Sequence, residues 1–261
     1  MNFETLIYQQ HDHYVEIRFN RPHRLNAVVE QFYIELISAL KQAQADNDAR
    51  AILLIGEGRA FCVGADMKEH GAGERSLFER RQYLQLGNDV CETIFELNKP
   101  VVAAVKGYAL GAGAEIACSC DFVLMEESAK IGFPEVSIGT CVGGGVTQFL
   151  PRLVGLAKAR ELIFLGDKID GNQAAQIGLI TKVVADDQLS AEAETFITRL
   201  AEKAPTSMQL VKKLLNQSTY NDLDTQLQLE LDGVFTCTTT KDWQEGVDAF
   251  AQKRTPKFKG C

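Results

Sequence analysis

The sequence lacks an excess of positive charge, because 27 lysines and arginines stand against 35 aspartates and glutamates and give a net charge of −8. Binding to nucleic acid or to an anionic membrane surface draws on clustered basic residues, so we expect neither as a partner. A long hydrophobic run is also missing: the longest charge-free stretch, residues 136–151, contains glycines and polar residues and is too short to span a bilayer. The first ten residues contain Glu4 and no long apolar segment, so no secretory signal peptide is expected.

Regularly spaced cysteines are missing as well. The 7 cysteines are an odd number, and most lie in apolar runs, where a thiol behaves as a small hydrophobic side chain. Since no spacing indicates a disulfide framework, we expect a soluble protein in a reducing compartment, the cytoplasm. Cys118 and Cys120 form a C-x-C pair, but no second pair of cysteines or histidines lies near them to complete a metal site, so no metal is expected.

The apolar segments predict an α/β core. With 46% hydrophobic and 24% charged residues the composition is typical of a globular protein, and 261 residues lie between one large domain and two small ones. Short apolar runs alternate with helical patterns, which is typical of a buried, largely parallel sheet. We expect strands at residues 3–9, 14–19, 51–55, 101–105, 122–125 and 131–138, and helices around Phe32 to Leu40 and over 77–97.

The character of the chain changes near residue 185. From Asp186 to Lys253 there are three or four helical patterns, few glycines and a single proline, Pro205. Their apolar faces are expected at Leu210, Leu214, Leu215, Leu227, Leu231, Val234 and Phe235. So short a helical set is more suited to docking or oligomerisation than to folding alone. We therefore divide the chain into a core of residues 1–185 and a helical region of residues 186–261.

Glycine is concentrated in one third of the chain, since 14 of the 21 glycines lie between Gly56 and Gly145. Two glycine-containing loops, 58–68 and 107–115, each follow a buried strand and lead towards a helix. Backbone N–H groups at such a position can bind an anion or stabilise an oxygen that becomes negative during a reaction. The pair Gly111-x-Gly113 resembles a dinucleotide-binding turn, but the third glycine is replaced by Ile116 and the following helix is short, so this alternative is weak.

Two acidic residues accompany these loops. Glu115 falls in the first turn of the helix that follows the second loop, where the helix dipole favours its charged form. Glu135 follows Pro134 among apolar residues, which favours partial burial and a bound proton. Two carboxyl groups in different environments can act as an acid/base pair. The alternative interpretation is an ordinary helix-start acid and a surface turn.

Taken in order, the motifs resemble the crotonase (enoyl-CoA hydratase/isomerase) family over almost the whole chain. Any single motif is weak evidence, whereas the ordered series is strong. The matching segments are Asn20-Arg21-Pro22, Leu25-Asn26-Ala27, 61–66, 107–115, Cys120-Asp121, 133–135, 143–148, 150–152, 245–246 and 250–254.

The resemblance implies a spiral of ββα units followed by a C-terminal helical trimerisation region, assembled as a homotrimer or a dimer of trimers. It implies an acyl-CoA thioester as substrate and an oxyanion hole made by the backbone N–H groups of Ala65 and Ala112. Many relatives have glycine where Ala112 stands, but only the N–H is needed, so the departure is mild.

Within the family, hydratases resemble one another in carrying two glutamates, and Glu115 and Glu135 fill both positions. The resemblance therefore implies an enoyl-CoA hydratase, in which Glu115 activates water for attack on Cβ and Glu135 exchanges the proton at Cα. No cofactor is expected, because coenzyme A is part of the substrate. One alternative is a Δ3,Δ2-enoyl-CoA isomerase, which needs only the later glutamate. Another is a non-catalytic relative that binds CoA or RNA.

The resemblance also implies the binding residues for CoA and for the acyl chain. The positions matched to CoA contacts are Arg24, Ala27, Val63, Ala65, Asp66, Met67 and Lys68, with Phe250 and Lys253 reaching CoA bound to a neighbouring subunit. His23 stands where relatives commonly have lysine, so we expect Arg24 to replace that phosphate contact. Val142 and Gly143 are expected in the acyl pocket. Because Val142 replaces a common proline, chain-length preference does not carry over from relatives.

Overall fold

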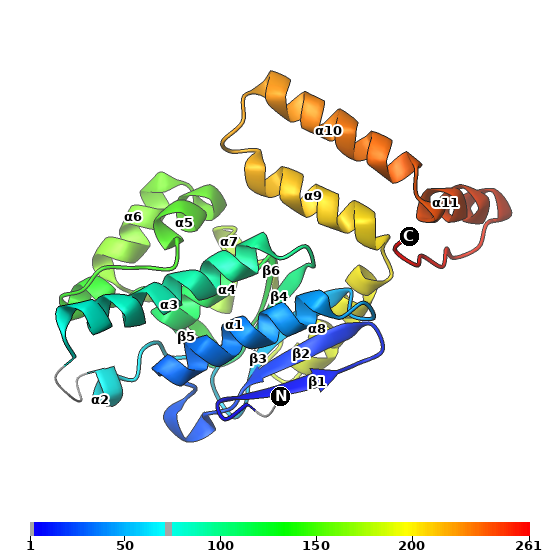
Figure 1. Cartoon of the computed structure of the whole chain (residues 1–261). Coiled ribbons are helices and arrows are strands. Elements are labelled where there is room, and N and C mark those ends of the chain that lie inside the picture. The colour runs from blue at the N-terminus through cyan, green and yellow to red at the C-terminus, as the bar shows by residue number, and fades with distance from the viewer. Residues whose placement is uncertain (1–2, 71–74) are drawn as a thin grey trace.

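The computed structural model describes residues 3–70 and 75–261, and its centre is a largely parallel β-sheet (Figure 1). Within these residues the sheet has six strands in the order β1-β2-β3-β4-β6-β9. Their bounds are β1 Leu6–Gln10, β2 Tyr14–Phe19, β3 Ala51–Gly56, β4 Val101–Val105, β6 Phe122–Glu126 and β9 Lys182–Val184. β1 pairs antiparallel with β2, and every later neighbour pair is parallel. The expected strands at 14–19, 51–55, 101–105 and 122–125 are thus confirmed.

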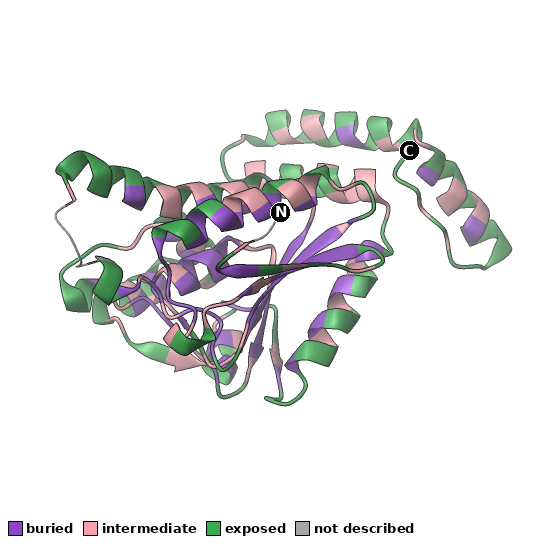
Figure 2. Ribbon diagram, turned by 60° about the horizontal axis from the view of Figure 1, so that its bottom comes forward, coloured by how far each residue is buried: buried purple, intermediate pink, exposed green. Residues whose placement is uncertain are grey.

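Helices cover both faces of this sheet, which explains why β3 and β4 are apolar at every position (Figure 2). Alternate side chains of β3 point to opposite faces, as the pleat of a strand requires. Ile52 and Leu54 pack in one cluster with α1 (Glu30–Ala45) and α3 (Leu77–Glu96). Leu53 packs on the other face against α8 (Leu189–Ala201). The two helices expected before residue 100 are confirmed.

A smaller sheet and several short helices build the part of the chain that carries the second glycine-rich loop. Its strands, within the described residues, are β5 Tyr108–Leu110, β7 Lys130–Gly132 and β8 Lys168–Asp170. The helices of this part are α2 Met67–His70, α4 Ala112–Ser119, α5 Val146–Val154, α6 Leu156–Leu165 and α7 Gly171–Gln176, and a 3-10 turn, η1, covers Pro22–Arg24.

The expected strand at 131–138 is wrong beyond its first two residues. β7 ends at Gly132, and residues Glu135–Ile138 form a 3-10 helix, η2, that Pro134 precedes. Proline has no N–H to donate to a strand ladder and favours the first turn of a helix, so the apolar run changes direction at this point. The change of direction places Glu135 at the start of η2.

The C-terminal helices stand away from the sheet (Figure 1). α9 (Pro205–Gln217), α10 (Leu223–Thr238) and α11 (Lys241–Gln252) follow α8, so the described residues after 185 form four helices, as expected. α8 packs on the core sheet, whereas α9 is tied to the core by Lys212, whose ammonium group donates to Asp121 at 2.7 Å and to the carbonyl oxygens of Ile94 and Lys99. No helix among the described residues is long and apolar enough to cross a membrane.

Candidate active site

The two glycine-rich loops meet at the end of the core sheet. Leu110 N–H donates to the carbonyl of Cys62 at 2.9 Å, and Cys62 N–H donates to the carbonyl of Tyr108 at 3.0 Å. A side chain at Gly64 would not fit, since a Cβ there would lie 2.9 Å from the Leu110 oxygen, and its φ of +90° favours glycine. The close approach of the loops therefore depends on Gly64.

This contact brings the amides of Ala65 and Ala112 together. Ala112 is the first residue of α4, where an N–H has no partner within the helix. Its nitrogen lies 3.6 Å from the position that a Cβ on Gly64, the residue bonded to Ala65, would occupy. Within the described part of the chain, neither amide donates to a backbone carbonyl. Two backbone N–H groups therefore lie close together where the loops meet.

Glu115 lies one turn into α4, with 8% of its surface exposed. Its Oε1 accepts the backbone N–H of Gly143 at 2.6 Å. Burial raises the pKa of this carboxyl to about 7, the charge of Glu135 adds to the increase, and the Gly143 hydrogen bond opposes it. Glu115 can therefore gain or lose a proton near neutral pH.

Glu135 begins η2 and is also 8% exposed. Its Oε1 approaches Gly111 so closely that a Cβ at Gly111 would lie 3.0 Å from this oxygen. The other oxygen, Oε2, is buried and has no hydrogen-bond partner among the described residues. Burial raises the pKa of Glu135 as well. Two carboxyls with raised pKa values in one cavity can act as an acid and a base.

Both glutamates and both amides line one cavity of about 490 Å³. Tyr33 from α1 and Tyr83, Leu84, Gly87 and Asn88 from α3 form a further part of its wall. Asn88 Oδ1 accepts the N–H of Gly144 at 2.9 Å, next to the Gly143–Glu115 hydrogen bond. These α1 and α3 residues were not predicted from the sequence, because they lie in ordinary amphipathic helices without a local motif.

Several of the residues predicted to bind CoA belong to one partly buried cluster of ion pairs and hydrogen bonds. Asp66 accepts two hydrogen bonds from the Arg24 guanidinium, at 3.0 and 3.2 Å, and one from Arg21 at 3.3 Å. Burial would raise the pKa of Asp66, but these hydrogen bonds outweigh it and hold the pKa below its usual value. Arg21 also donates to the carbonyl of the buried residue Ala27. Asp66 and Ala27 are therefore engaged by arginines in this structure.

Other predicted CoA contacts lie at the edge of the cavity. Val63 and Met67 line it beside Ala65, and Met67 is largely exposed. Lys68 is exposed on α2, and its backbone N–H donates to Asp66. Val63, Ala65 and Met67 thus form part of the cavity wall, and Asp66 and Lys68 are their neighbours in the chain.

Arg24, Ala27, Asp66 and Lys68 do not line the cavity itself, and neither do the predicted residues Val142, Phe250 and Lys253. Val142 packs against the hydrophobic core, so Thr140, Cys141, Gly143 and Gly144 form the wall there instead. Phe250, which is 89% exposed, and Lys253 lie at the end of α11, beside a different cavity. In a single chain the C-terminal pair is thus separated from Glu115 and Glu135.

The described residues contain no group of three or more His, Cys, Asp or Glu side chains placed to hold a metal ion. All seven cysteines are free, and Cys118 and Cys120 lie at the far end of α4 from the cavity.

Comparisons with known proteins agree with one another. The family model for enoyl-CoA hydratase/isomerase matches residues 10–261. The chain is 34% identical over 259 residues to a crotonyl-CoA hydratase of Syntrophomonas wolfei, covering 99% of both chains. It is 35% identical over 255 residues to a short-chain-enoyl-CoA hydratase of Clostridium acetobutylicum, covering 97% of both. The crystal structure of an enoyl-CoA hydratase from Bacillus anthracis superposes with a TM-score of 0.95 at 34% identity, over 99% of this chain and 100% of that one.

Proposed function

Since the chain belongs to the enoyl-CoA hydratase/isomerase family and has the crotonase fold, we propose that it adds water across the 2,3-double bond of a 2-enoyl-CoA thioester, or removes it in reverse. The observation that carries this proposal is one cavity lined by two buried glutamates and by Ala65 and Ala112, whose amides donate to no backbone carbonyl in the described part of the chain. The named relatives support a short acyl chain, because one is a crotonyl-CoA hydratase and another a short-chain-enoyl-CoA hydratase.

The thioester oxygen is the first atom to be placed. Attack of water on Cβ moves negative charge onto this oxygen, which the N–H groups of Ala65 and Ala112 then stabilise as an oxyanion hole. Each such donor is typically worth about 3–4 kcal/mol in the transition state. The donors are held in place before the substrate arrives, because Gly64 and the start of α4 fix the two loops.

The glutamates divide the proton transfers. Gly143 occupies Oε1 of Glu115, which leaves the other oxygen to orient a water molecule and accept its proton. Glu135 delivers a proton to Cα through the oxygen that lacks a partner among the described residues. Carboxyls with raised pKa values can exchange protons with water and with Cα near neutral pH. The net reaction adds only water, so it calls for no redox cofactor.

Coenzyme A is bound as part of the substrate. Lys68 and Arg24 supply positive charge beside the cavity, and the Arg24 side chain keeps 33% of its surface exposed although it is paired with Asp66. CoA phosphates bind to such groups through charge-assisted hydrogen bonds. Phe250 and Lys253 contact CoA that is bound to a neighbouring subunit. Within their own chain they lie at the end of α11, away from the cavity that contains Glu115 and Glu135.

A homotrimer, or a dimer of trimers, supplies that neighbour. Large apolar side chains are exposed along the C-terminal helices, and a group of such side chains on adjacent helices typically marks an interface. They are Val211, Leu215, Leu223, Leu227, Leu231, Val234, Phe235, Trp243, Val247 and Phe250. Sedimentation of the purified protein as a monomer at micromolar concentration would contradict this part of the proposal. The free cysteines support a cytoplasmic location, where thiols stay reduced, and the proposed substrate class is typical of fatty acid metabolism.

The direct test is hydration of crotonyl-CoA, followed as loss of the ultraviolet absorbance of the conjugated thioester. We expect turnover by the purified protein and a loss of about a hundred- to ten-thousand-fold in Glu115→Gln and in Glu135→Gln. Glu127→Gln, which removes an exposed carboxyl, is the matched control and should retain activity. Unchanged absorbance with crotonyl-CoA and with trans-2-hexenoyl-CoA would contradict the proposal. If Glu115→Gln abolishes hydration but converts 3-enoyl-CoA to 2-enoyl-CoA, the protein also has isomerase activity.

A further inference from the structure

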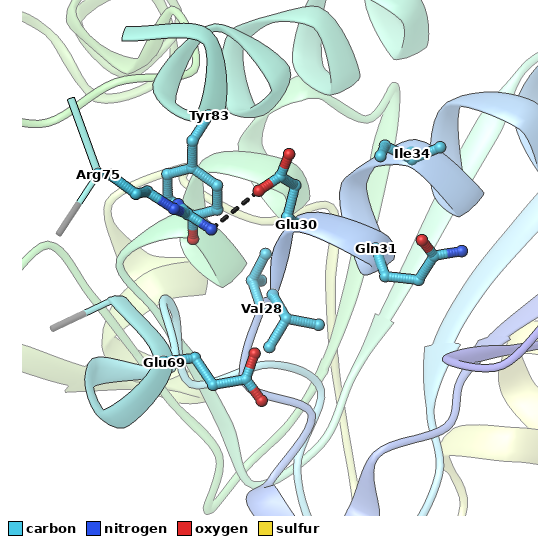
Figure 3. Close-up of a pocket in the computed structure, with 8 residues that line it drawn as sticks. Val28, Glu30, Gln31, Ile34, Glu69, Arg75 and Tyr83 are labelled. Atoms are coloured by element: carbon cyan, nitrogen blue, oxygen red, sulfur yellow. Dashed lines mark hydrogen bonds and ion pairs between the residues drawn. The ribbon is translucent and has the colours of Figure 1, made fainter. Parts of the chain in front are cut away.

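A second cavity, of about 340 Å³, lies beside the site (Figure 3). Val28, Val29 and Ile34 give it an apolar side, and Glu30, Glu69 and Arg75 give it a polar one. Tyr83 lines this cavity and also lines the cavity that contains Glu115 and Glu135. The side chain of Tyr83 therefore lies in the wall between the two spaces.

Tyr83 is held in this wall from two sides. The guanidinium of Arg75 stands over the Tyr83 ring, 4.5 Å from its centre, and forms an ion pair of 2.8 Å with Glu30 (Figure 3). The ring of Tyr33 lies at a centroid distance of 5.9 Å, and Tyr83 is only 5% exposed. A cation over an aromatic face and an ion pair behind it each favour this single position of the ring.

The position of Tyr33 indicates which end of the substrate meets Tyr83. Tyr33 is close enough to Glu115 and Tyr83 that their charges, after the larger effect of burial, raise the pKa of its hydroxyl. Glu115 is proposed to activate the water that attacks Cβ, so the acyl carbons beyond Cβ lie on this side of the site. Met67, a proposed CoA contact, lines the same cavity from α2.

We infer that Tyr83 is a specificity-determining residue that closes the acyl end of the site and restricts the enzyme to short 2-enoyl-CoA substrates. The cavity behind it is the space that the distal carbons of a longer chain occupy once the ring is removed. This inference rests on the proposed hydratase function. One methylene more or less in an apolar pocket is typically worth about 10- to 200-fold in kcat/KM, so a single ring can decide the preferred chain length.

The experiment compares kcat/KM for trans-2-octenoyl-CoA and crotonyl-CoA in the wild type, Tyr83→Ala and Tyr83→Leu. We expect the octenoyl to crotonyl ratio to rise at least tenfold in both variants, and Tyr83→Phe, which keeps the ring, to retain the wild-type ratio. Arg75→Ala, which removes the cation over the ring and keeps the ring itself, should raise the ratio by a smaller factor. Arg80→Ala, an exposed arginine on the same helix, is its control.

A readout without turnover separates this inference from the proposed function. Titration calorimetry with saturated octanoyl-CoA should show at least tenfold tighter binding to Tyr83→Ala than to the wild type. If the wild type hydrates crotonyl-CoA but the ratio and the octanoyl-CoA affinity are unchanged in Tyr83→Ala and Tyr83→Leu, the inference is wrong and the function stands. If no enoyl-CoA is hydrated by the wild type, the proposed function fails first, and the octanoyl-CoA affinities still decide the role of Tyr83.

Discussion

The backbone N–H of Gly143 lies 2.6 Å from Oε1 of Glu115, so the glycine loop before α5 and the proposed base hold each other in place. The loop is also held from the opposite side, because Gly144 donates to Asn88 on α3. Asn88 thus acts on Glu115 through two adjacent peptide groups. This makes it a positioning residue whose effect can be measured apart from the chemistry itself.

We predict that Asn88→Ala lowers kcat for hydration by about tenfold and moves the pH profile. Without its acceptor the Gly144 N–H no longer fixes the loop, and the Gly143 hydrogen bond that lowers the Glu115 pKa weakens. The ascending limb of the kcat profile, which follows ionisation of the base, should therefore move to higher pH. The measurement is kcat for crotonyl-CoA between pH 5 and 9.

Two further variants test this interpretation. Asn88→Asp keeps an acceptor oxygen and should retain most of kcat, although its charge also raises the pKa of Glu115. Gln85→Ala, one turn away and bonded only to Asp89 among the described contacts, should behave as the wild type. If Asn88→Ala lowers kcat but leaves the ascending limb of the pH profile at the same pH, Asn88 does not position Glu115.

Replacement of Glu115 by Gln should stabilise the folded protein at neutral and alkaline pH. The folded-state pKa is about 7, above the ordinary value of 4.5, so between these values the folded state binds more protons than the unfolded state. Wild-type stability therefore falls as pH rises from about 4.5 to about 7, by an amount on the order of 3 kcal/mol for a shift of this size.

Because glutamine does not ionise, the stability of the Glu115→Gln protein should not fall in this pH range. Urea denaturation at pH 5 and at pH 8 checks the prediction: Glu115→Gln should gain stability relative to the wild type at pH 8 and much less at pH 5. Equal differences at the two pH values would show that Glu115 does not ionise within the buried site.

Gly64→Ala should reduce kcat by about a hundred- to a thousand-fold, the typical effect of losing one oxyanion donor. The new Cβ would lie 2.9 Å from the Leu110 carbonyl, and the φ of +90° is unfavourable for alanine, so the loop must shift and carry Ala65 with it. Gly155→Ala is the matched control, because Gly155 also has a positive φ but a Cβ there meets nothing within 4 Å. Comparable losses of kcat in both variants would point to general strain instead of a displaced amide.

Lys212→Met should lower the free energy of unfolding by about 3–5 kcal/mol, since it leaves the Asp121 carboxylate without its buried partner. The double variant Lys212→Met/Asp121→Asn removes that charge as well and should be more stable than the single one. Lys213→Met replaces the exposed neighbour and should change stability little. Chemical denaturation measures all three. A Lys212→Met protein as stable as Lys213→Met would show that the ion pair does not hold α9 on the core.

Strands that consist of an unbroken apolar run were predictable from the sequence. β4 is buried at every position between two layers of helix, so its sequence Val-Val-Ala-Ala-Val admits few other structures. The strand expected at 131–138 failed because apolar content alone does not distinguish a strand from the 3-10 turn that Pro134 begins. Strands of three residues, such as β5 and β8, carry too little sequence to be recognised before their partners are known.

The candidate site was predictable where its residues share a motif. Glu115 lies in the glycine-rich segment that forms α4, and the structure brings it into one cavity with Glu135, as the sequence analysis expected of a pair. Tyr33, Tyr83 and Asn88 were not predictable, because their place in the wall follows from how α1 and α3 cross the sheet. The arginine partners of Asp66 were missed for the same reason, since Asp66 and Arg24 meet only in the folded chain.

The strands of the main sheet join in the same order in which they occur in the chain, from β1 to β9. Each new strand therefore pairs with one that has already left the ribosome, and none has to be inserted between two existing neighbours. Chains emerge at about 5–20 residues per second, and a sheet of this topology can grow from its N-terminal edge during synthesis. The active-site loops that follow β3 and β4 can thus take shape before α9, α10 and α11 have been made.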